Sequence, residues 1–295
     1  MSTGATPSPS ADPAASTRLR PGVIGLGAIG RGVAISLARR GHLPSVFDLR
    51  PEAAAGLDGI ACQESSAAEV ARKSDVILVA ALDEPQVHNA LTKPDGILAG
   101  AHAGTIVVVL STISVDAVHR FADVCVGGGV ELLDCGVTPG DQAPNNGLVA
   151  FVGGSDAVVA RAMPVLNGFA RAVVHCGPIG TGMTVKIARN MISYCTWTVV
   201  DEAVDLAHAP GVDRDTMLAA LRAADARDPQ YLKMLEVRAS GFEVSSERID
   251  NALNTAAKDL DAATILADSY AVRLPLTEAT KPLVREVFIR NGGVR

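Results

Sequence analysis

The chain has 295 residues, of which 48% are hydrophobic and 20% charged, and its formal net charge is −6. This length is enough for two domains whose cores need neither metal ions nor disulfides for stability. The acidic balance argues against nucleic acid or an anionic membrane as a partner, so a small molecule is the expected ligand.

The cysteines and the N-terminal segment bear on the compartment. Five cysteines, an odd number without a C-x-x-C pair, favour buried free thiols in a reducing compartment over disulfides or a metal site. They are Cys62, Cys125, Cys135, Cys176 and Cys195. No apolar run approaches the roughly 20 residues that span a bilayer. Residues 1–20 are rich in Ser, Thr, Ala and Pro and are predicted to be a disordered tail, so we expect a cytoplasmic protein.

Residues 21–178 are predicted to form a doubly wound α/β domain. Short β-branched runs alternate there with Ala-rich amphipathic segments, which is typical of βαβ units. Several runs are apolar throughout, as strands buried on both faces of a sheet must be. We therefore predict a Rossmann-type, mostly parallel sheet, with strands at 22–26, 45–49, 75–80, 105–110, 130–134, 148–152 and 172–176.

Residues 179–295 are predicted to form an all-α domain, because no strand pattern follows Cys176. The domain boundary is expected near Gly177–Gly182, and ligands are commonly bound between domains. The expected helices span 182–208, 213–224, 229–239, 246–269 and 276–290.

A glycine-rich segment, GLGAIG, follows the first predicted strand and opens a helix. Gly25 would allow the tight turn, Gly27 would let the backbone approach a pyrophosphate, and Gly30 would let helix and strand pack closely. The pyrophosphate would rest on the unpaired amides of the helix N-terminus. The sequence thus predicts a dinucleotide site formed by Gly25, Leu26, Gly27, Ala28, Ile29 and Gly30.

The choice between NAD and NADP depends on two residues after the second predicted strand. Asp48 lies about 20 residues beyond the glycines, as the dinucleotide fingerprint requires. Its carboxylate can accept hydrogen bonds from the ribose hydroxyls and would repel a 2′-phosphate, which favours NAD. Arg50 could instead bind a 2′-phosphate, so NADP stays possible.

Four motifs follow one another along the chain: GLGAIGRGVA (25–34), DCGVTPGDQAPNNGLVAFVGG (134–154), GPIGTGMTVKIARN (177–190) and KDLDAA (258–263). In this order they resemble the β-hydroxyacid dehydrogenase family, and the resemblance covers residues 22–288. It implies a reversible hydride transfer between a small 3-hydroxy acid and NAD or NADP. It also implies a homodimer or homotetramer that pairs through the helical domain.

The resemblance implies that Lys186 is the general base during oxidation and the general acid during reduction. A desolvated lysine near a positively charged nicotinamide should have a lowered pKa, which leaves a neutral amine to accept a proton. The alternative is a surface lysine whose stem covers apolar area while its ammonium reaches water. Asn190, one helical turn further, is implied to hold the substrate.

The same resemblance implies further ligand contacts. Ser111 and Thr112 could also simply cap the next helix, which is compatible with a ligand contact, and Lys258 could be an ordinary surface lysine. The implied cofactor contacts are Leu82, Asp83, Thr112 and Lys258, and the implied substrate contacts are Ser111, Thr138, Gly140 and Asn190. No metal site is expected.

The chain departs from the family pattern in its second motif. The family usually has D-A-P-V-S-G-G, whereas this chain has DCGVTPG, with Pro139 between Thr138 and Gly140. Proline has no N–H, so one potential donor to a substrate carboxylate is missing and the loop is stiffer. We therefore expect the substrate carboxylate to be held differently, or replaced by another acidic or polar group.

Some alternatives stay open at this point. Trp197 could line the cleft or pack within a domain or subunit interface, and Tyr231 could line the pocket or lie exposed on a helix. The competing functions are an NADP-dependent semialdehyde reductase of the same family and a dinucleotide-binding scaffold without turnover. The joint presence of Lys186, Asn190 and Lys258 argues against the scaffold, and Lys186 argues against an imine reductase, which usually lacks this lysine.

Overall fold

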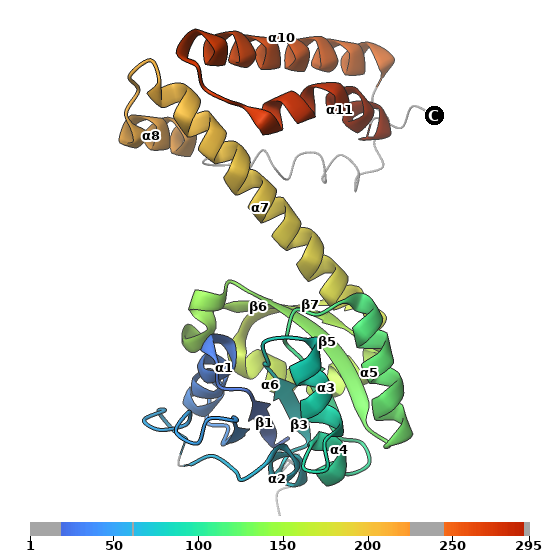
Figure 1. Cartoon of the computed structure of the whole chain (residues 1–295). Helices are drawn as coiled ribbons and strands as arrows, with labels where there is room; N and C mark the ends of the chain where they lie inside the picture. Colours follow the sequence, from blue (N-terminus) through green and yellow to red (C-terminus); the bar gives the residue numbers. More distant parts are fainter. Residues whose placement is uncertain (1–18, 61, 225–244, 292–295) are drawn as a thin grey trace, which may run out of the picture. The chain divides into compact units, whose positions relative to one another are not determined.

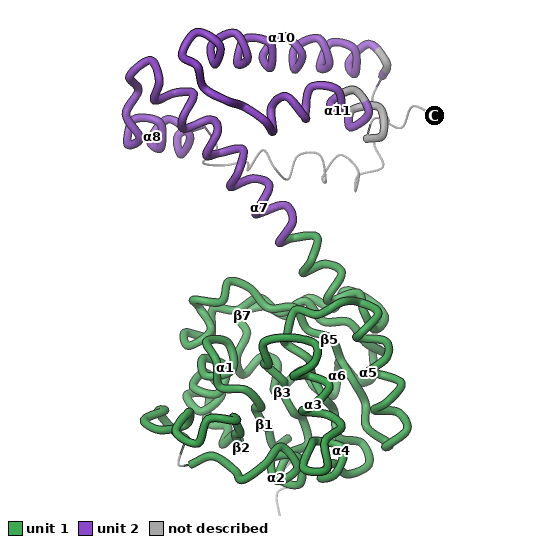
Figure 2. Tube along the Cα trace, viewed as in Figure 1, with its two compact units in different colours: residues 1–189 green, residues 190–295 purple. Residues whose placement is uncertain are grey.

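The computed structural model describes residues 19–60, 62–224 and 245–291. The chain divides into two compact units, residues 1–189 and 190–295 (Figures 1 and 2). The domain bounds expected from the sequence, 21–178 and 179–295, remain a prediction. The expected helix at 229–239, with Tyr231, lies outside the described residues.

One mostly parallel sheet forms the centre of the first unit (Figure 1). Its strand order is β2-β1-β3-β4-β5-β6-β7, and only the β5–β6 pair is antiparallel. All of the expected strands are present, which confirms the predicted fold class. They are β1 (Pro21–Ile24), β2 (Ser45–Phe47), β3 (Val76–Val79), β4 (Ile106–Val109), β5 (Glu131–Thr138), β6 (Leu148–Gly153) and β7 (Ala170–Gly177).

Helices cover both faces of this sheet. Successive side chains of a strand point to opposite faces, and those of β1, β3 and β4 are buried at every position, so both faces must be covered. Val23 and Val108 belong to a core shared with α1 and α6, whereas Val79 and Val109 belong to a core shared with α2, α3 and α5. Met183, in the first turn of α7, joins the second core. The bounds are α1 (Ala28–Arg39), α2 (Ala67–Lys73), α3 (Glu84–Thr92), α4 (Ile97–Gly100), α5 (Val115–Gly127), the 3₁₀ helix η1 (Gly140–Asn145), α6 (Asp156–Phe169) and α7 (Thr181–His208).

The strand register brings the ends of β1, β3 and β4 to one level, next to the middle of β5. Ile24 of β1 pairs with Val79 of β3, Val79 with Val109 of β4, and Val109 with Asp134 of β5. The chain adds β2 on one side of β1 and β3 on the other, so the strand order reverses there. Open α/β sheets bind ligands at such a switch point. The loops that follow β1, β3 and β4 therefore meet where a ligand is expected.

The second unit consists of helices in its described part, as predicted. After α7 these are α8 (Arg214–Ala224), α10 (Ser246–Tyr270) and α11 (Pro275–Asn291). Glu202 of α7 is buried, and its carboxylate accepts hydrogen bonds from the backbone N–H groups of Leu276 and Thr277 at 2.7 and 3.2 Å. This carboxylate caps the N-terminus of α11 and holds that helix to α7.

The structure corrects one expectation about the cysteines. All five are free thiols, but Cys62 and Cys195 are exposed, so the expectation of buried thiols is wrong for these two. Burial raises the pKa of Cys125 to about 12, which makes this thiol inert. Within the described ranges, no helix has both the length and the apolar character that a membrane span requires, and no group of metal-ligating side chains is found.

Candidate active site

The glycine-rich loop between β1 and α1 has the backbone geometry that its sequence predicted. Gly25 has φ of +87°, and a Cβ there would lie 2.5 Å from the carbonyl oxygen of Ala80. A Cβ on Gly30 would lie 1.8 Å from the carbonyl oxygen of Gly25, so α1 can approach β1 only with glycine at this position. At Gly27, by contrast, no described atom lies within 4 Å of the Cβ position, so this stretch of backbone is open to a ligand.

The N-terminus of α1 is suited to hold an anion. Gly27 is its N-cap residue, no side chain in the described part of the chain caps this helix, and its first turn has no acidic residue. The first backbone N–H groups of a helix have no partner within the helix, and the helix dipole favours negative charge there. A dinucleotide pyrophosphate fits this cradle in both charge and space.

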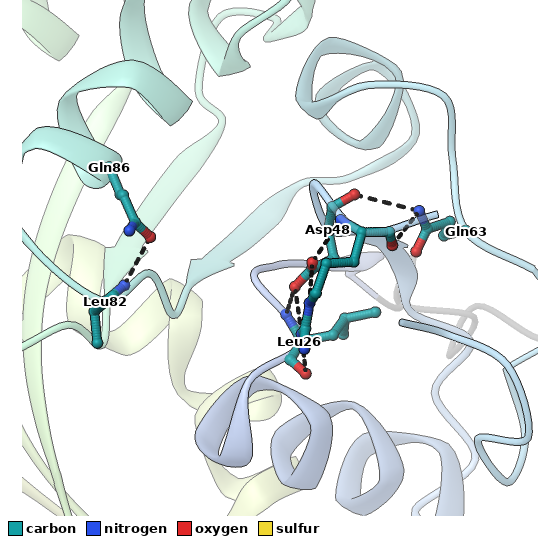
Figure 3. Close-up of polar contacts among 6 residues, drawn as sticks. Leu26, Asp48, Gln63, Leu82 and Gln86 are labelled. Atoms are coloured by element: carbon teal, nitrogen blue, oxygen red, sulfur yellow. Dashed lines mark hydrogen bonds and ion pairs between the residues drawn. The ribbon is translucent and has the colours of Figure 1, made fainter. Parts of the chain in front are cut away.

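Asp48, directly after β2, is tied to the glycine-rich loop (Figure 3). Its carboxylate accepts the backbone N–H of Leu26 at 2.7 Å, and both the backbone N–H and the Nε–H of Arg50 at 2.9 Å. Burial favours a higher pKa for Asp48, but these hydrogen bonds outweigh it and hold the pKa below its usual range. The carboxylate is therefore charged at neutral pH.

Arg50 occupies acceptor sites that a ribose could use. Its Nη2 lies 3.2 Å from Asp48 Oδ2 and 3.2 Å from the carbonyl oxygen of Leu26, so the guanidinium bridges the loop and the carboxylate. Gln63 donates from Nε2 to the carbonyl oxygens of Asp48 and Arg50, both at 3.2 Å (Figure 3). Sequence reasoning missed Gln63, which belongs to no motif and lies 15 residues after Asp48.

The loop after β3 contains two of the predicted cofactor contacts, Leu82 and Asp83. The Leu82 side chain is exposed, and its backbone N–H donates to Gln86 Oε1 at 3.2 Å (Figure 3). Asp83 caps α3 by accepting the backbone N–H of Gln86 at 2.9 Å. Gln86 therefore holds this loop to the start of α3, with Leu82 presented to solvent.

The loop after β4 contains the predicted pair Ser111 and Thr112. Ser111 is buried, and its hydroxyl donates to the carbonyl oxygen of Ala81 at 2.8 Å, so it links the loops after β3 and β4. Thr112 is exposed. The residue that caps α5 is Ser114, which accepts the backbone N–H of Ala117 at 3.1 Å. Helix capping by Ser111 or Thr112, the alternative considered above, is therefore wrong.

Lys186 of α7 is buried, with 9% of its surface exposed. Its Nζ donates a hydrogen bond to the carbonyl oxygen of Val137 on β5 at 2.7 Å. Burial lowers the pKa of Lys186, and the positive charge of Arg189 lowers it further. The alternative of a solvent-exposed surface lysine is therefore wrong. A Cβ on Gly136 would lie 2.3 Å from the Lys186 Cβ, so glycine at 136 makes room for this side chain.

The predicted substrate loop follows directly after β5, the strand whose Val137 carbonyl accepts the hydrogen bond from Lys186. Thr138 is buried at the end of β5, and Gly140 begins η1. A Cβ on Gly140 would lie 3.1 Å from Ile29 Cδ1, in the glycine-rich segment. The structure thus brings the phosphate cradle, the Thr138–Gly140 loop and the Lys186 amine together in the first unit.

A buried serine on α1 joins the cradle helix to η1, the segment that follows the Thr138–Gly140 loop. The Ser36 hydroxyl donates to the carbonyl oxygen of Ala143 at 2.7 Å and accepts the backbone N–H of Asn146 at 3.1 Å. A Cβ on Gly32 would lie 2.5 Å from the Ala143 Cβ, so η1 lies directly on α1. Sequence reasoning missed Ser36, because a serine on a helix gives no signal for a partner more than 100 residues away.

Two family models together match almost the whole chain. One describes the NAD binding domain of 6-phosphogluconate dehydrogenase and matches residues 20–177. The other describes the NAD-binding domain of NADP-dependent 3-hydroxyisobutyrate dehydrogenase and matches residues 180–294. The chain is also 30% identical over 282 residues to the 2-hydroxy-3-oxopropionate reductase of Escherichia coli, with 92% of each chain covered. The chain belongs to the β-hydroxyacid dehydrogenase family.

Other members support this assignment of a β-hydroxyacid dehydrogenase. The 2-(hydroxymethyl)glutarate dehydrogenase of Eubacterium barkeri is 29% identical over 262 residues, which covers 87% of this chain and 85% of the relative. The crystal structure of a putative oxidoreductase from Mycobacterium avium 104 aligns with a TM-score of 0.80 at 26% identity, over 92% of this chain and 99% of that one. The protein is thus an NAD(P)-dependent oxidoreductase.

Two site residues implied by the family resemblance belong to the second unit of this β-hydroxyacid dehydrogenase. Asn190 follows Lys186 by one turn of α7 and is half-buried. Lys258 on α10 is exposed, with its Nζ 3.7 Å from Asp259 Oδ1. The Trp197 side chain is 66% exposed and meets the ring of Tyr194 edge-on at 5.3 Å. The ligand roles of Asn190 and Lys258 remain predictions.

Proposed function

We propose that this β-hydroxyacid dehydrogenase transfers a hydride reversibly between a small 3-hydroxy acid and NAD, with Lys186 as the general acid and base. The observation that carries the proposal is the buried amine of Lys186, held 2.7 Å from the Val137 carbonyl oxygen beside the Thr138–Gly140 loop. When bound, the nicotinamide supplies the chemistry of accepting or returning the hydride. The side chains of the protein must therefore accept and donate the proton.

Lys186 suits this proton transfer in both directions. With a lowered pKa, its amine is neutral over a wider pH range and can take the proton of the substrate hydroxyl as the alcohol is oxidised. The ammonium formed returns that proton to the carbonyl oxygen during reduction. The hydrogen bond to Val137 uses one N–H of the amine and leaves its lone pair for the substrate.

Several residues are proposed to bind the cofactor. The amides at the start of α1 would hold the pyrophosphate along Gly25–Gly30, and Asp48 would bind the adenosine ribose. Leu82, Asp83 and Thr112 follow neighbouring strand ends of the same sheet, which supports their role. Lys258 is proposed on the basis of its KDLDAA motif alone.

The proposed substrate class rests on the relatives and on the loop after β5. In both 2-hydroxy-3-oxopropionate and 2-(hydroxymethyl)glutarate, the carbon that would be reduced or oxidised is β to a carboxylate. For the carboxylate of such an acid, this chain offers the Thr138 hydroxyl and the Gly140 backbone N–H, together with Ser111 and Asn190. Pro139 donates nothing, so the carboxylate would be held by fewer loop N–H groups than in a Ser-Gly-Gly loop.

NAD is the proposed cofactor, and use of NADP is the alternative. The charged carboxylate of Asp48 beside the glycine-rich loop supports NAD, because it would repel a 2′-phosphate. The observation that favours NADP is Arg50, whose exposed guanidinium lies at the same place. A semialdehyde reductase that uses NADP is therefore the second candidate function.

The domain organisation and assembly are part of the proposal. We place the NAD(P)-binding domain at 21–178 and the substrate and dimerisation domain at 179–295, supported by family models that meet between 177 and 180. A homodimer or homotetramer in the cytoplasm is supported by free thiols and by exposed apolar side chains on the helices of the second unit. These include Met191, Ile192, Trp197, Leu218, Ile265 and Leu283.

Initial rates of nicotinamide reduction, with NAD⁺ and NADP⁺ separately across a panel of small 3-hydroxy acids, test this function. Lys186→Ala should lower kcat by about 10² to 10⁴ while cofactor affinity is kept, since a general base is removed. Lys258→Ala, which lies in the other unit, separates loss of proton transfer from a weaker cofactor contact. Undiminished turnover in Lys186→Ala would overturn the mechanism, and a wild type that binds NAD but oxidises nothing would favour the scaffold.

A further inference from the structure

A buried carboxylate on β5 takes no part in the chemistry described above. Asp134 is fully buried, with 0% of its surface exposed. Its Oδ1 accepts the backbone N–H of Gly180 at 2.7 Å, and its Oδ2 accepts the backbone N–H of Met183 at 2.6 Å. Both oxygens of Asp134 are thus directed at the N-terminus of α7, the helix that carries Lys186.

Strand β5 therefore holds α7 at two successive points. Asp134 binds the amide of Met183, and three residues further on each element Val137 accepts the hydrogen bond from Lys186 Nζ. A helix is a stiff element, so a shift of its first turn moves a side chain one turn later by a similar amount. The position of the Lys186 amine depends on where Asp134 fixes the start of the helix.

Glycines at the contact points leave little freedom for the first turn of α7. A Cβ on Gly153, the β6 partner of Asp134, would lie 2.2 Å from Asp134 Oδ1. A Cβ on Gly182 would lie 2.4 Å from the carbonyl oxygen of Phe151. The helix thus lies directly on the backbone of β6, with the carboxylate of Asp134 reaching its amides through the space that the glycines leave.

The burial of Asp134 is costly, and capping of a helix does not require it. Burial raises the pKa of Asp134, and the hydrogen bonds from Gly180 and Met183 counteract only part of this effect. Elsewhere in the chain Ser66 and Ser114 cap α2 and α5 with single hydroxyls. A buried two-pronged carboxylate fixes both the position and the direction of a helix start, which a single hydroxyl does not.

We infer that Asp134 is the positioning residue that sets the Lys186 amine against the Val137 carbonyl oxygen, and so keeps the general base buried where the proposed function requires it. This inference rests on the proposed function for its catalytic meaning. In the described part of the chain, the other titratable groups that interact with this arrangement are Cys135 from β5, His119 from α5 and Cys176 from β7 at Asp134, and Arg189 from α7 at Lys186.

The test compares Asp134→Asn with the wild type by the pH dependence of reductive methylation of Lys186, measured by peptide mass spectrometry. The asparagine keeps the shape but replaces one acceptor oxygen by an N–H₂ donor, which cannot accept a hydrogen bond from the backbone N–H of Gly180 or Met183. We expect water to reach the loosened amine and the midpoint of methylation to move upward, toward the ordinary lysine pKa. In the same variant kcat should fall about tenfold to a hundredfold, because small displacements of catalytic groups have effects of this size.

Glu202→Gln is the matched control, because Glu202 caps the start of α11 with its carboxylate as Asp134 caps α7. It should lower the melting temperature and leave the methylation midpoint unchanged. If Asp134→Asn does not fold, Asp134→Glu is the second variant. It keeps the charge but lengthens the side chain against Gly153, and it should give the same upward shift of the methylation midpoint. An unchanged midpoint in a folded Asp134 variant would overturn the inference. Methylation needs no turnover, so an inactive wild type would refute the proposed function and leave this test intact.

Discussion

Lys186 Nζ lies 2.7 Å from the carbonyl oxygen of Val137, on a strand whose next residue, Thr138, opens the predicted substrate loop. The amine that would move the proton and the loop that would hold the substrate are therefore positioned by the same few residues of β5. Because Gly136 precedes them and admits the lysine stem, the stretch from Gly136 to Thr138 determines both proton transfer and substrate position.

The first prediction concerns the pH dependence of the reaction. A buried lysine with a lowered pKa loses its proton at a pH below 10.5, the ordinary pKa of lysine. The rate of alcohol oxidation should therefore rise with pH and level off below that value. The rate of aldehyde reduction should fall over the same interval, because that direction needs the ammonium. Initial rates in both directions from pH 6 to pH 11 check this, and parallel pH profiles for oxidation and reduction would contradict the assignment of Lys186.

The lowered pKa of Lys186 also makes the stability of the protein depend on pH, in a direction that can be predicted. The pKa of Lys186 is lower in the folded state than in the unfolded chain, so between the two values the unfolded chain binds more protons. The contribution of this residue to the free energy of unfolding should therefore increase with pH through that interval. Urea unfolding of the wild type and Lys186→Met at several pH values measures it, and the free energy of unfolding of the wild type minus that of the methionine variant should increase as pH rises.

The second prediction separates two glycines of the phosphate cradle. Gly27→Ala should leave the melting temperature almost unchanged, because the Cβ enters open space, but it should weaken NAD binding by obstructing the pyrophosphate. Gly30→Ala should destabilise the protein by about 1 to 3 kcal/mol, because its Cβ would overlap the Gly25 carbonyl oxygen. Thermal unfolding and NAD titration of both variants test this, and equal loss of stability in the two would show that the cradle is not open at Gly27.

The third prediction concerns the choice of cofactor. Arg50→Ala removes the guanidinium that bridges Asp48 and Leu26, so Asp48 gains free acceptor sites for ribose hydroxyls. We expect kcat/KM with NAD to be kept or raised. Any activity with NADP should fall about tenfold to a hundredfold, as expected for the loss of charged hydrogen bonds to a phosphate. Arg72→Ala, at an exposed ion pair on α2, is the control, and an unchanged NADP to NAD ratio in Arg50→Ala would exclude Arg50 from the choice.

The elements of this fold could be predicted from sequence because their signals are local. Apolar runs marked the strands, and the spacing of Gly25, Gly27 and Gly30 indicated a backbone geometry that the structure confirms. The contacts that position the site are not local. Asp134 reaches Met183 across 49 residues and Ser36 reaches Ala143 across 107, and no periodic pattern records such a pairing. Proximity in sequence also suggested helix capping as the alternative for Ser111, but its hydroxyl donates to the carbonyl oxygen of Ala81 in the neighbouring loop.

The last prediction follows from the contact of Ser36 with the segment after the substrate loop. Ser36→Ala leaves the Ala143 carbonyl and the Asn146 amide without their buried partner, which should cost about 1 to 3 kcal/mol of stability. The 3₁₀ helix η1 would then be held less firmly on α1, and the loop from Thr138 to Gly140 would lose its fixed position. We expect KM for the acid substrate to rise and the dissociation constant for NAD to stay unchanged, because the cradle lies at the other end of α1.

Ser66, the serine that caps the N-terminus of α2, provides the control for Ser36. Ser66→Ala removes the N-terminal cap of α2 and should cost about 1 kcal/mol, a loss of stability that overlaps the range expected for Ser36→Ala. Because α2 packs against α4, β1 and β2, this variant should keep the wild-type KM. Steady-state kinetics and thermal unfolding of both variants separate the two effects. If Ser36→Ala loses stability but keeps its KM for the acid, the position of the substrate loop does not depend on the hydrogen bonds of Ser36.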